Sequence, residues 1–235
     1  MVSLEPTTVE PIAVEQIAVE PTPLEPAQLS FKMQAYRALK GSIMEMDIYG
    51  QRGEIRIDDR EVCQLLGISR TPVREALILL EHEGFVRTVP RHGVVVARKS
   101  RTQIADMILV WAALEGMAAR LAATLAEESD LIQLAQDFPP SLAHTPDSAA
   151  GLHQSLAELS RCALIGSLTR NLALHMRAIH RIEQADETQA AQAVEARTAV
   201  VAALTARDGA QAESLILKHH FALNQYIQRT CAFLD

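Results

Sequence analysis

SRTPVREAL occupies residues 69–77 and decides the fold of the first half of this chain. Ser69 is a good helix N-cap, and Pro72 falls in the first helical turn, where its missing N–H removes no hydrogen bond. Apolar residues then recur at helical spacing and form one face, made of Val73, Ala76, Leu77 and Leu80. The stretch therefore predicts a helix whose exposed N-terminal end carries Arg70, Thr71 and Arg74.

A second predicted helix precedes this one and a hairpin follows it. Residues 58–66 begin with two aspartates and carry an apolar stripe, and Gly67-Ile68 forms a short turn before the next helix. Downstream, Gly84 has the place of a C′ residue, and residues 85–89 and 94–97 have the composition of two β-strands around a basic, glycine-containing turn. Helix, turn, helix and wing are typical of a DNA-binding domain.

Residues 33–97 resemble the winged-helix domain of the GntR family of bacterial transcription regulators, whose signature centres on the Ser-Arg-x-Pro-Val-Arg-Glu-Ala-Leu run. The resemblance implies operator DNA as the partner, contacted by arginines of both helices and by the wing tip. Carried over residue by residue, the implied DNA-contacting set is Arg60, Ser69, Arg70, Thr71, Arg74, His92 and Gly93. The family's usual Gly-x-x-x-Pro-Gly connection is replaced here by residues 46–53, where we expect the same turn with looser geometry.

Charge divides the chain into three segments. Residues 1–29 carry five acidic and no basic residues, residues 30–101 carry thirteen basic and nine acidic (net +4), and residues 102–235 carry nine basic and fifteen acidic (net −6), within a total of −7. Only the middle segment has the electrostatic character that DNA binding needs. We expect a disordered acidic pentapeptide-repeat tail over 1–29, a winged helix-turn-helix domain over 30–100, and an all-α effector-binding and dimerisation domain over 101–235. An arm that limits nonspecific DNA contact or packs on a partner fits the tail as well.

The C-terminal segment has a helical pattern throughout, rich in alanine and leucine. Helices are expected over residues 102–126, 128–136, 147–160, 163–185, 188–207 and 209–231. The fold class is therefore mainly α, with the winged helix-turn-helix domain followed by an all-α bundle of six or seven helices. The apolar run from Ile104 to Ala126 is interrupted by three charged residues, which favours a buried helix over a membrane span.

This segment resembles the helical, FCD-like effector-binding domain of the FadR-type branch of the family, through Leu114-Glu115, Leu152-His153 and the stretch that leads to His219. Many members of that branch bind a divalent metal with one aspartate and three histidines. The matching positions here hold Ala149, His153, Arg197 and His219. Because an arginine repels a metal ion, no cofactor is expected; a bound zinc, nickel or manganese ion would be held by His153 and His219. His220 is expected to point elsewhere.

A metal-free cavity is the resulting hypothesis for effector binding. In it Arg197 grips a small carboxylate, His153 and His219 hydrogen-bond it, and Trp111, which stands where the family has an arginine, stacks on its apolar part. The alternative is that His153, Arg197 and His219 are ordinary interior polar residues of a bundle without an effector.

The expected function is a cytoplasmic homodimer that binds operator DNA, a repressor whose operator affinity is modulated by a small organic acid. One alternative is an effector-less architectural DNA-binding dimer, and another is an enzyme domain fused to a winged helix. Against the enzyme, the chain has no glycine-rich phosphate loop and no Gly-x-Ser-x-Gly elbow, so no catalytic residues are assigned. Three cysteines at unrelated spacings fit a reducing cytoplasm, and no membrane partner is expected.

Overall fold

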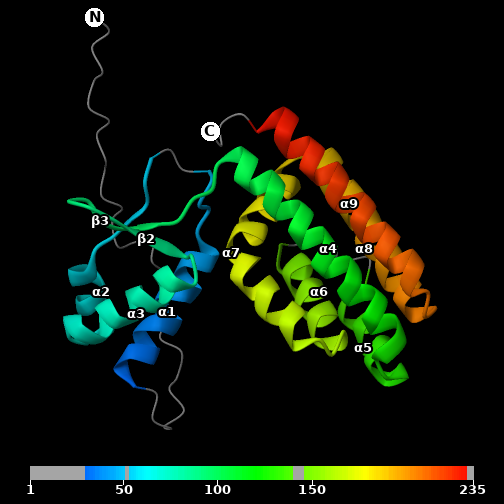
Figure 1. The fold of residues 1–235 in the computed structure, drawn as a ribbon, viewed down its shortest axis with the longest axis horizontal. Coiled ribbons are helices and arrows are strands. Elements are labelled where there is room, and N and C mark those ends of the chain that lie inside the picture. Colours follow the sequence, from blue (N-terminus) through cyan, green and yellow to red (C-terminus); the bar gives the residue numbers. More distant parts are fainter. Residues whose placement is uncertain (1–29, 51–52, 140–145, 232–235) are drawn as a thin grey trace, which may run out of the picture. The chain divides into compact units, whose positions relative to one another are not determined.

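The computed structural model describes residues 30–50, 53–139 and 146–231, shown as coloured ribbon in Figure 1. The expected tail over residues 1–29 lies outside this range. The chain divides into two compact units, with the division between Arg98 and Lys99. Unit 1 ends at Arg98, and unit 2 begins at Lys99.

Unit 1 has the winged helix-turn-helix arrangement. Its elements are α1 (Phe31–Glu45), β1 (Arg56–Ile57), α2 (Asp59–Leu66), α3 (Arg70–His82), β2 (Val86–Val89) and β3 (Gly93–Val96). The strands form an antiparallel sheet in the order β1-β3-β2, in which Val86 is opposite Val96 and Val89 is opposite Gly93. The sequence predicted the β2–β3 wing but not β1, whose two residues pair with Val94 and Val95.

The residues that flank α2 and α3 show how these two helices begin and end. The Asp58 side chain accepts a hydrogen bond from the backbone N–H of Arg60, and Gly67 ends α2 with a φ of 66°, a left-handed conformation that glycine adopts without strain. Ser69 is the N-cap residue of α3, but its side chain makes no capping hydrogen bond. The predicted apolar face of α3 is buried, together with Ala35, Leu39 and Ile43 of α1.

The connection at residues 46–53, which differs from the family's usual Gly-x-x-x-Pro-Gly pattern, contains a turn. The backbone N–H of Gly50 donates to Asp47 Oδ1 over 2.8 Å, and a Cβ placed on Gly50 would lie 1.9 Å from Asp47 Oδ2. A side chain at position 50 would therefore require the Asp47 carboxylate to move away from this turn. Ile48 and Tyr49 are buried and anchor the turn to the core.

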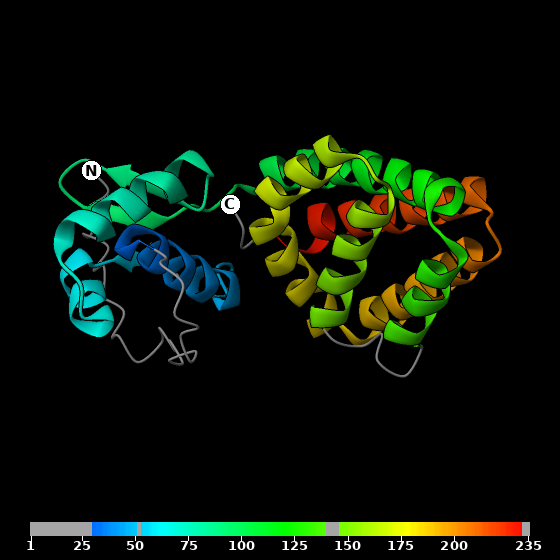
Figure 2. The same ribbon diagram turned by 90° about the horizontal axis from the view of Figure 1, so that it is seen from below.

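Unit 2 is all-α in its described residues. Its helices are α4 (Arg101–Leu125), α5 (Glu128–Asp137), α6 (Pro146–Leu159), α7 (Ala163–Ala185), α8 (Glu187–Thr205) and α9 (Gly209–Thr230), which confirms the predicted fold class. Helix α4 lies alongside α9 in both views (Figure 1 and Figure 2). Asp208 caps α9 as predicted, by accepting from the N–H of Gln211.

Helix α4 is long and apolar enough to cross a membrane by length and composition alone. Half of its most apolar window is buried inside the protein, where Ala118, Ala119, Ala122 and Ala123 belong to the hydrophobic core. The helix also carries Glu115, which is buried and hydrogen-bonded to His153 of α6. These are features of the core helix of a bundle, and they account for its composition.

Candidate functional site

The first candidate site is the surface formed by the N-terminal ends of α2 and α3 and by the wing. All seven residues of the implied DNA-contacting set are exposed: Arg60, Ser69, Arg70, Thr71, Arg74, His92 and Gly93. Arg74 Nε donates to Asp59 Oδ2 over 2.9 Å, so the beginnings of α2 and α3 lie side by side. The arrangement presents cationic and hydroxyl side chains where a recognition helix meets base edges and phosphates.

Two further arginines extend this basic surface along the wing. Arg91, at the tip, is exposed and has a φ of 66°, and Arg56 of β1 is exposed with its guanidinium about 3.6 Å from where a Cβ on Gly93 would lie. Gly93 itself has a φ of 87°, which favours glycine. The sequence did not assign Arg56, because its strand is too short to show a pattern.

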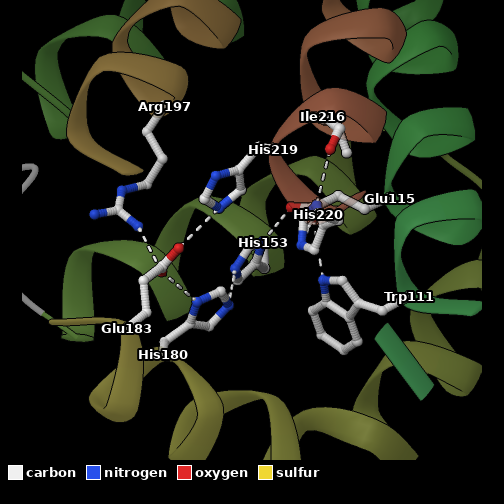
Figure 3. Close-up of polar contacts among 9 residues, drawn as sticks. All are labelled: Trp111, Glu115, His153, His180, Glu183, Arg197, Ile216, His219 and His220. Atoms are coloured by element: carbon white, nitrogen blue, oxygen red, sulfur yellow. Dashed lines mark hydrogen bonds and ion pairs between the residues drawn. The ribbon is translucent and has the colours of Figure 1, made fainter. Parts of the chain in front are cut away.

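The second candidate site is a polar cluster in the core of unit 2, drawn in Figure 3. Five helices contribute to it: Trp111 and Glu115 from α4, His153 from α6, His180 and Glu183 from α7, Arg197 from α8, and His219 and His220 from α9. The four residues assigned from the sequence, namely Trp111, His153, Arg197 and His219, are therefore all part of one cluster.

Glu115 is the centre of one half of the cluster. Its carboxylate accepts hydrogen bonds from Trp111 Nε1, over 3.1 Å, and from His153 Nδ1, and it lies 3.3 Å from His220 Nε2. Burial alone would raise the pKa of Glu115, but the charge and the hydrogen bond of His153 outweigh burial and lower that pKa to about 2. The carboxyl group is therefore ionised at neutral pH.

Glu183 is the centre of the other half. One carboxylate oxygen lies 3.1 Å from His180 Nδ1 and 4.0 Å from Arg197 Nη1, and the other lies 3.4 Å from His219 Nε2. Burial favours the neutral acid, but the His180 hydrogen bond and the neighbouring charges lower the pKa of Glu183 to about 2. The two halves are joined by a 2.9 Å contact between His153 Nε2 and His180 Nε2.

Burial also decides the charge of several histidines in the cluster. It lowers the pKa of His180 and of His220 below the ordinary value, and it lowers that of His219 to about 3. The nearby carboxylates act in the opposite direction but are outweighed in each case. His219 and His220 are therefore neutral at neutral pH.

A small cavity adjoins the cluster. Its volume is about 20 Å³, and apolar side chains such as Leu152 and Val200 line it beside Glu115, Arg197 and His219. A space of that size holds about one water molecule. An organic acid would need a larger cavity.

Sequence reasoning missed half of the cluster. It did not assign Glu115, His180 or Glu183, and its prediction that His220 points elsewhere is wrong, because His220 Nε2 lies beside Glu115. Adjacent residues on a helix are about 100° apart, but the cluster surrounds this part of α9, so His219 faces Glu183 and His220 faces Glu115.

The cluster does not fit the divalent metal ion that many members of the FadR-type branch bind. The position of the aspartate holds Ala149, whose side chain is fully buried, and Arg197 brings its guanidinium beside Glu183. Both ring nitrogens of His153 already contact protein groups. Within the described residues, no group of three or more His, Cys, Asp and Glu side chains is placed to hold a metal ion.

Helix-turn-helix, wing and all-α unit together define a winged-helix DNA-binding regulator. Residues 33–96 match the family described as "Bacterial regulatory proteins, gntR family". The chain belongs to this family and, with its helical C-terminal domain, is homologous to FadR-type regulators. Its homologues are transcriptional regulators, and the chain is a transcription regulator rather than an enzyme.

Individual relatives cover different parts of the chain. It is 24% identical over 204 residues to the HTH-type transcriptional repressor RspR of Escherichia coli K12, covering 83% of this chain and 88% of that protein. It is 33% identical over 100 residues to the Glc operon transcriptional activator of the same strain, covering 36% of this chain and 39% of the activator. The solved structure of E. coli McbR/YncC has the same fold, with a TM-score of 0.68, 20% identity, and coverage of 84% of this chain and 98% of that chain.

Proposed function

We propose that this regulator is a cytoplasmic homodimer that binds a specific operator, with its two α3 helices in successive major grooves roughly 34 Å apart. The observation that carries the proposal is the exposure of Arg70, Thr71 and Arg74 at the start of α3, beside an exposed Arg60 on α2. An arginine in this place contacts guanine edges or phosphates, which supply specificity and affinity.

The outer face of α4 and α9 supports the dimer. Leu109, Val110 and Met117 of α4 and Phe221 of α9 are large apolar side chains that are 44–53% exposed. A surface groove of about 600 Å³ continues the face along α9, where Leu217 and Ala222 line it. Apolar area of this kind, rimmed by polar residues, is typical of a protein–protein contact. A second copy of the chain is the occupant that two-fold operator binding requires.

The test begins with DNA selected by the wild-type protein from a random pool. Arg70→Ala should lose selective binding to that DNA, by roughly 5- to 150-fold in affinity if one bidentate base contact is removed. Helicity and sedimentation should stay unchanged, because Arg70 is exposed. Arg170→Ala, which removes an exposed arginine from α7 of unit 2, is the matched control and should bind as the wild type does. Equal operator affinity of Arg70→Ala and wild type would refute the assignment of α3.

We propose that the regulatory ligand is a small carboxylate that pairs with Arg197. His153 and His219 hydrogen-bond this ligand, and Trp111 lies at its edge. Arg197 is buried, and its guanidinium faces the Glu183 carboxylate at 4.0 Å. Because the adjoining cavity has room for about one water molecule, an incoming acid must displace Glu183. Displacement would free the end of α7 and offers a way to couple binding to operator affinity.

The same small cavity favours the second candidate function, a DNA-binding dimer without an effector. Thermal melting against a panel of small organic acids separates the two, since a ligand that binds the folded state raises the melting temperature. A selective rise that Arg197→Met removes would support the carboxylate. A flat response of the wild type across the panel would favour the effector-less dimer. Operator affinity is then measured with and without the active acid. This comparison shows whether the acid releases the regulator from DNA, which would relieve repression, or strengthens DNA binding.

A further inference from the structure

The segment before α1 contains acidic residues but no basic ones. Residues 1–29 carry five glutamates, which recur at every fifth position: Glu5, Glu10, Glu15, Glu20 and Glu25. A leucine or a valine precedes each glutamate, as in Leu4-Glu5 and Val9-Glu10. The segment therefore offers a repeated pair of one apolar side chain and one carboxylate, and operator binding does not account for this repeat.

Net charge favours one part of the chain as the partner of this segment. Residues 102–235 have a net charge of −6 and repel a segment of charge −5, whereas residues 30–101, with a net charge of +4, attract it. Among the described contacts, four exposed arginines of unit 1 have no acidic partner: Arg56, Arg60, Arg70 and Arg91. Unit 1 therefore presents positive charge that a carboxylate can pair with.

The exposed face of α3 suits a pair of an apolar side chain and a carboxylate. Arg70, Arg74 and Ile78 follow one another at intervals of four residues, so their side chains share one face of the helix. Arg74 Nε already donates to a carboxylate, that of Asp59, over 2.9 Å. Ile78, one turn further along, is a large apolar side chain that is 64% exposed. Guanidinium and apolar groups therefore lie next to each other on this face, as carboxylate and apolar groups do in the repeat.

The segment is long enough to reach this face. Tyr36 of α1 donates to the Glu83 carboxylate over 2.7 Å, at the C-terminal end of α3. Six residues of α1 span about 9 Å and the 13 of α3 about 20 Å, so with the two joining side chains Arg70 lies within roughly 40 Å of Ser30. A chain of about fifteen residues reaches at most about 50 Å. Glu15 and the two glutamates before it can therefore reach Arg70.

We infer that residues 1–29 dock on the DNA-contacting surface of unit 1 and compete with DNA for it; the inference rests on the proposed operator binding by this surface. The glutamates pair with the exposed arginines, and an adjoining valine or leucine contacts Ile78. Because the segment is joined to unit 1, its effective concentration at the surface is on the order of 1 mM, so a contact with a Kd of about 0.1 mM fills the surface about nine-tenths of the time. DNA affinity then falls about tenfold.

Such a competitor lowers every DNA affinity by the same factor, because it must leave before any duplex binds. The test uses full-length protein that carries Glu5→Gln, Glu10→Gln, Glu15→Gln, Glu20→Gln and Glu25→Gln. Fluorescence anisotropy measures binding to the operator selected by the wild type and to a duplex of unrelated sequence. Both affinities should rise about tenfold at about 50 mM salt, and the gain should shrink toward about 200 mM, because salt screens the contact. Affinities equal to those of the wild type would overturn the inference.

The matched control removes five negative charges from exposed positions of unit 2, through Glu128→Gln, Asp130→Asn, Glu158→Gln, Glu187→Gln and Glu195→Gln. Its net charge equals that of the first variant, but its residues 1–29 are unchanged. It should bind both duplexes within about twofold of the wild type, because exposed charges further away than a Debye length are largely screened. An equal gain in both variants would mean that net charge alone sets DNA affinity, and docking would then be wrong.

A second measurement separates this inference from the proposed function. Backbone amide spectra of the wild type and of the five-glutamine variant are compared without DNA. Shift differences should gather at the first turns of α2 and α3 and at the wing tip, with none in unit 2. Differences confined to unit 2, or absent from unit 1, would overturn docking even if both proteins bind the operator. If the shifts appear as expected but Arg70→Ala keeps full operator affinity, the proposed function fails and the docking contact stands.

Discussion

In unit 1 the arginines of α2 and α3 are exposed on the surface, whereas in unit 2 a cluster of charged side chains lies in the core. Arg74 is paired with Asp59 but remains 64% exposed, so its guanidinium is open to a partner. Glu115 and Glu183 are almost completely buried, and their partners are side chains of the same unit. Ion pairs of the same kind therefore have two different roles in this protein. Exposed charge is available to DNA, while buried charge joins five helices.

The comparison predicts very different costs for breaking the two kinds of pair. Glu115→Ala leaves Trp111 Nε1 and His153 Nδ1 without their acceptor, so we expect unit 2 to lose about 3–5 kcal/mol of stability. Urea unfolding followed by the fluorescence of Trp111, the only tryptophan, measures this loss directly.

Glu213→Ala is the matched control for this loss. Its carboxylate pairs with Arg120, which is 57% exposed, and removing it should change stability by at most about 1 kcal/mol. If Glu115→Ala cost no more than Glu213→Ala, the buried cluster would not hold the helices of unit 2 together.

Lowering the pH should destabilise unit 2 before unit 1. Because the pKa of both Glu115 and Glu183 is lowered to about 2 from 4.5, the unfolded chain takes up these protons first, and their contribution to stability is lost as the pH falls from 4.5 toward 2. His219, whose pKa is lowered to about 3 from 6.5, acts in the same direction between pH 6.5 and 3. Each group changes the unfolding free energy by about 1.4 kcal/mol per pH unit within its range.

Unit 1 should resist the same treatment better. In its described part, the Glu83 carboxyl is the acid whose pKa is lowered; partial burial raises that pKa, but the Lys40 ammonium outweighs burial. Hydrogen exchange at pH 7, 5 and 4 should therefore show loss of protection in peptides of α4, α7 and α9 before those of α1 and α3. Simultaneous loss in both units, or loss in unit 1 first, would contradict the comparison.

How well the sequence predicted each helix or strand depended on the length of its residue pattern. The range 163–185 was predicted for α7 and is observed as Ala163–Ala185, because more than six turns of apolar periodicity leave little choice. Strand β1 has two residues, too few for any periodicity to appear, and it exists only because β3 offers it an edge.

The buried cluster was half predicted for a related reason. His153, Arg197 and His219 were found through a family pattern, whereas His180 and Glu183 belong to no pattern that the sequence showed. A signal was nevertheless present. Glu115 and Glu183 each interrupt a long helical apolar stripe, and a charged residue at a buried position of a helix needs a partner from another helix. Which partner it meets depends on helix packing, which separations of 27 to 38 residues along the chain do not reveal.

The smallest expected effect comes from the surface pair of unit 1. Asp59→Asn should change stability by less than about 1 kcal/mol, since Arg74 stays exposed and solvated. Operator affinity should instead rise by a few-fold, because Arg74 is released toward phosphate and one negative charge leaves the DNA-facing surface. Glu61→Gln is the matched control: it removes a carboxylate from the same first turn of α2. An equal rise in both variants would mean that net charge alone matters, and only a larger rise in Asp59→Asn at matched salt concentration identifies the release of Arg74.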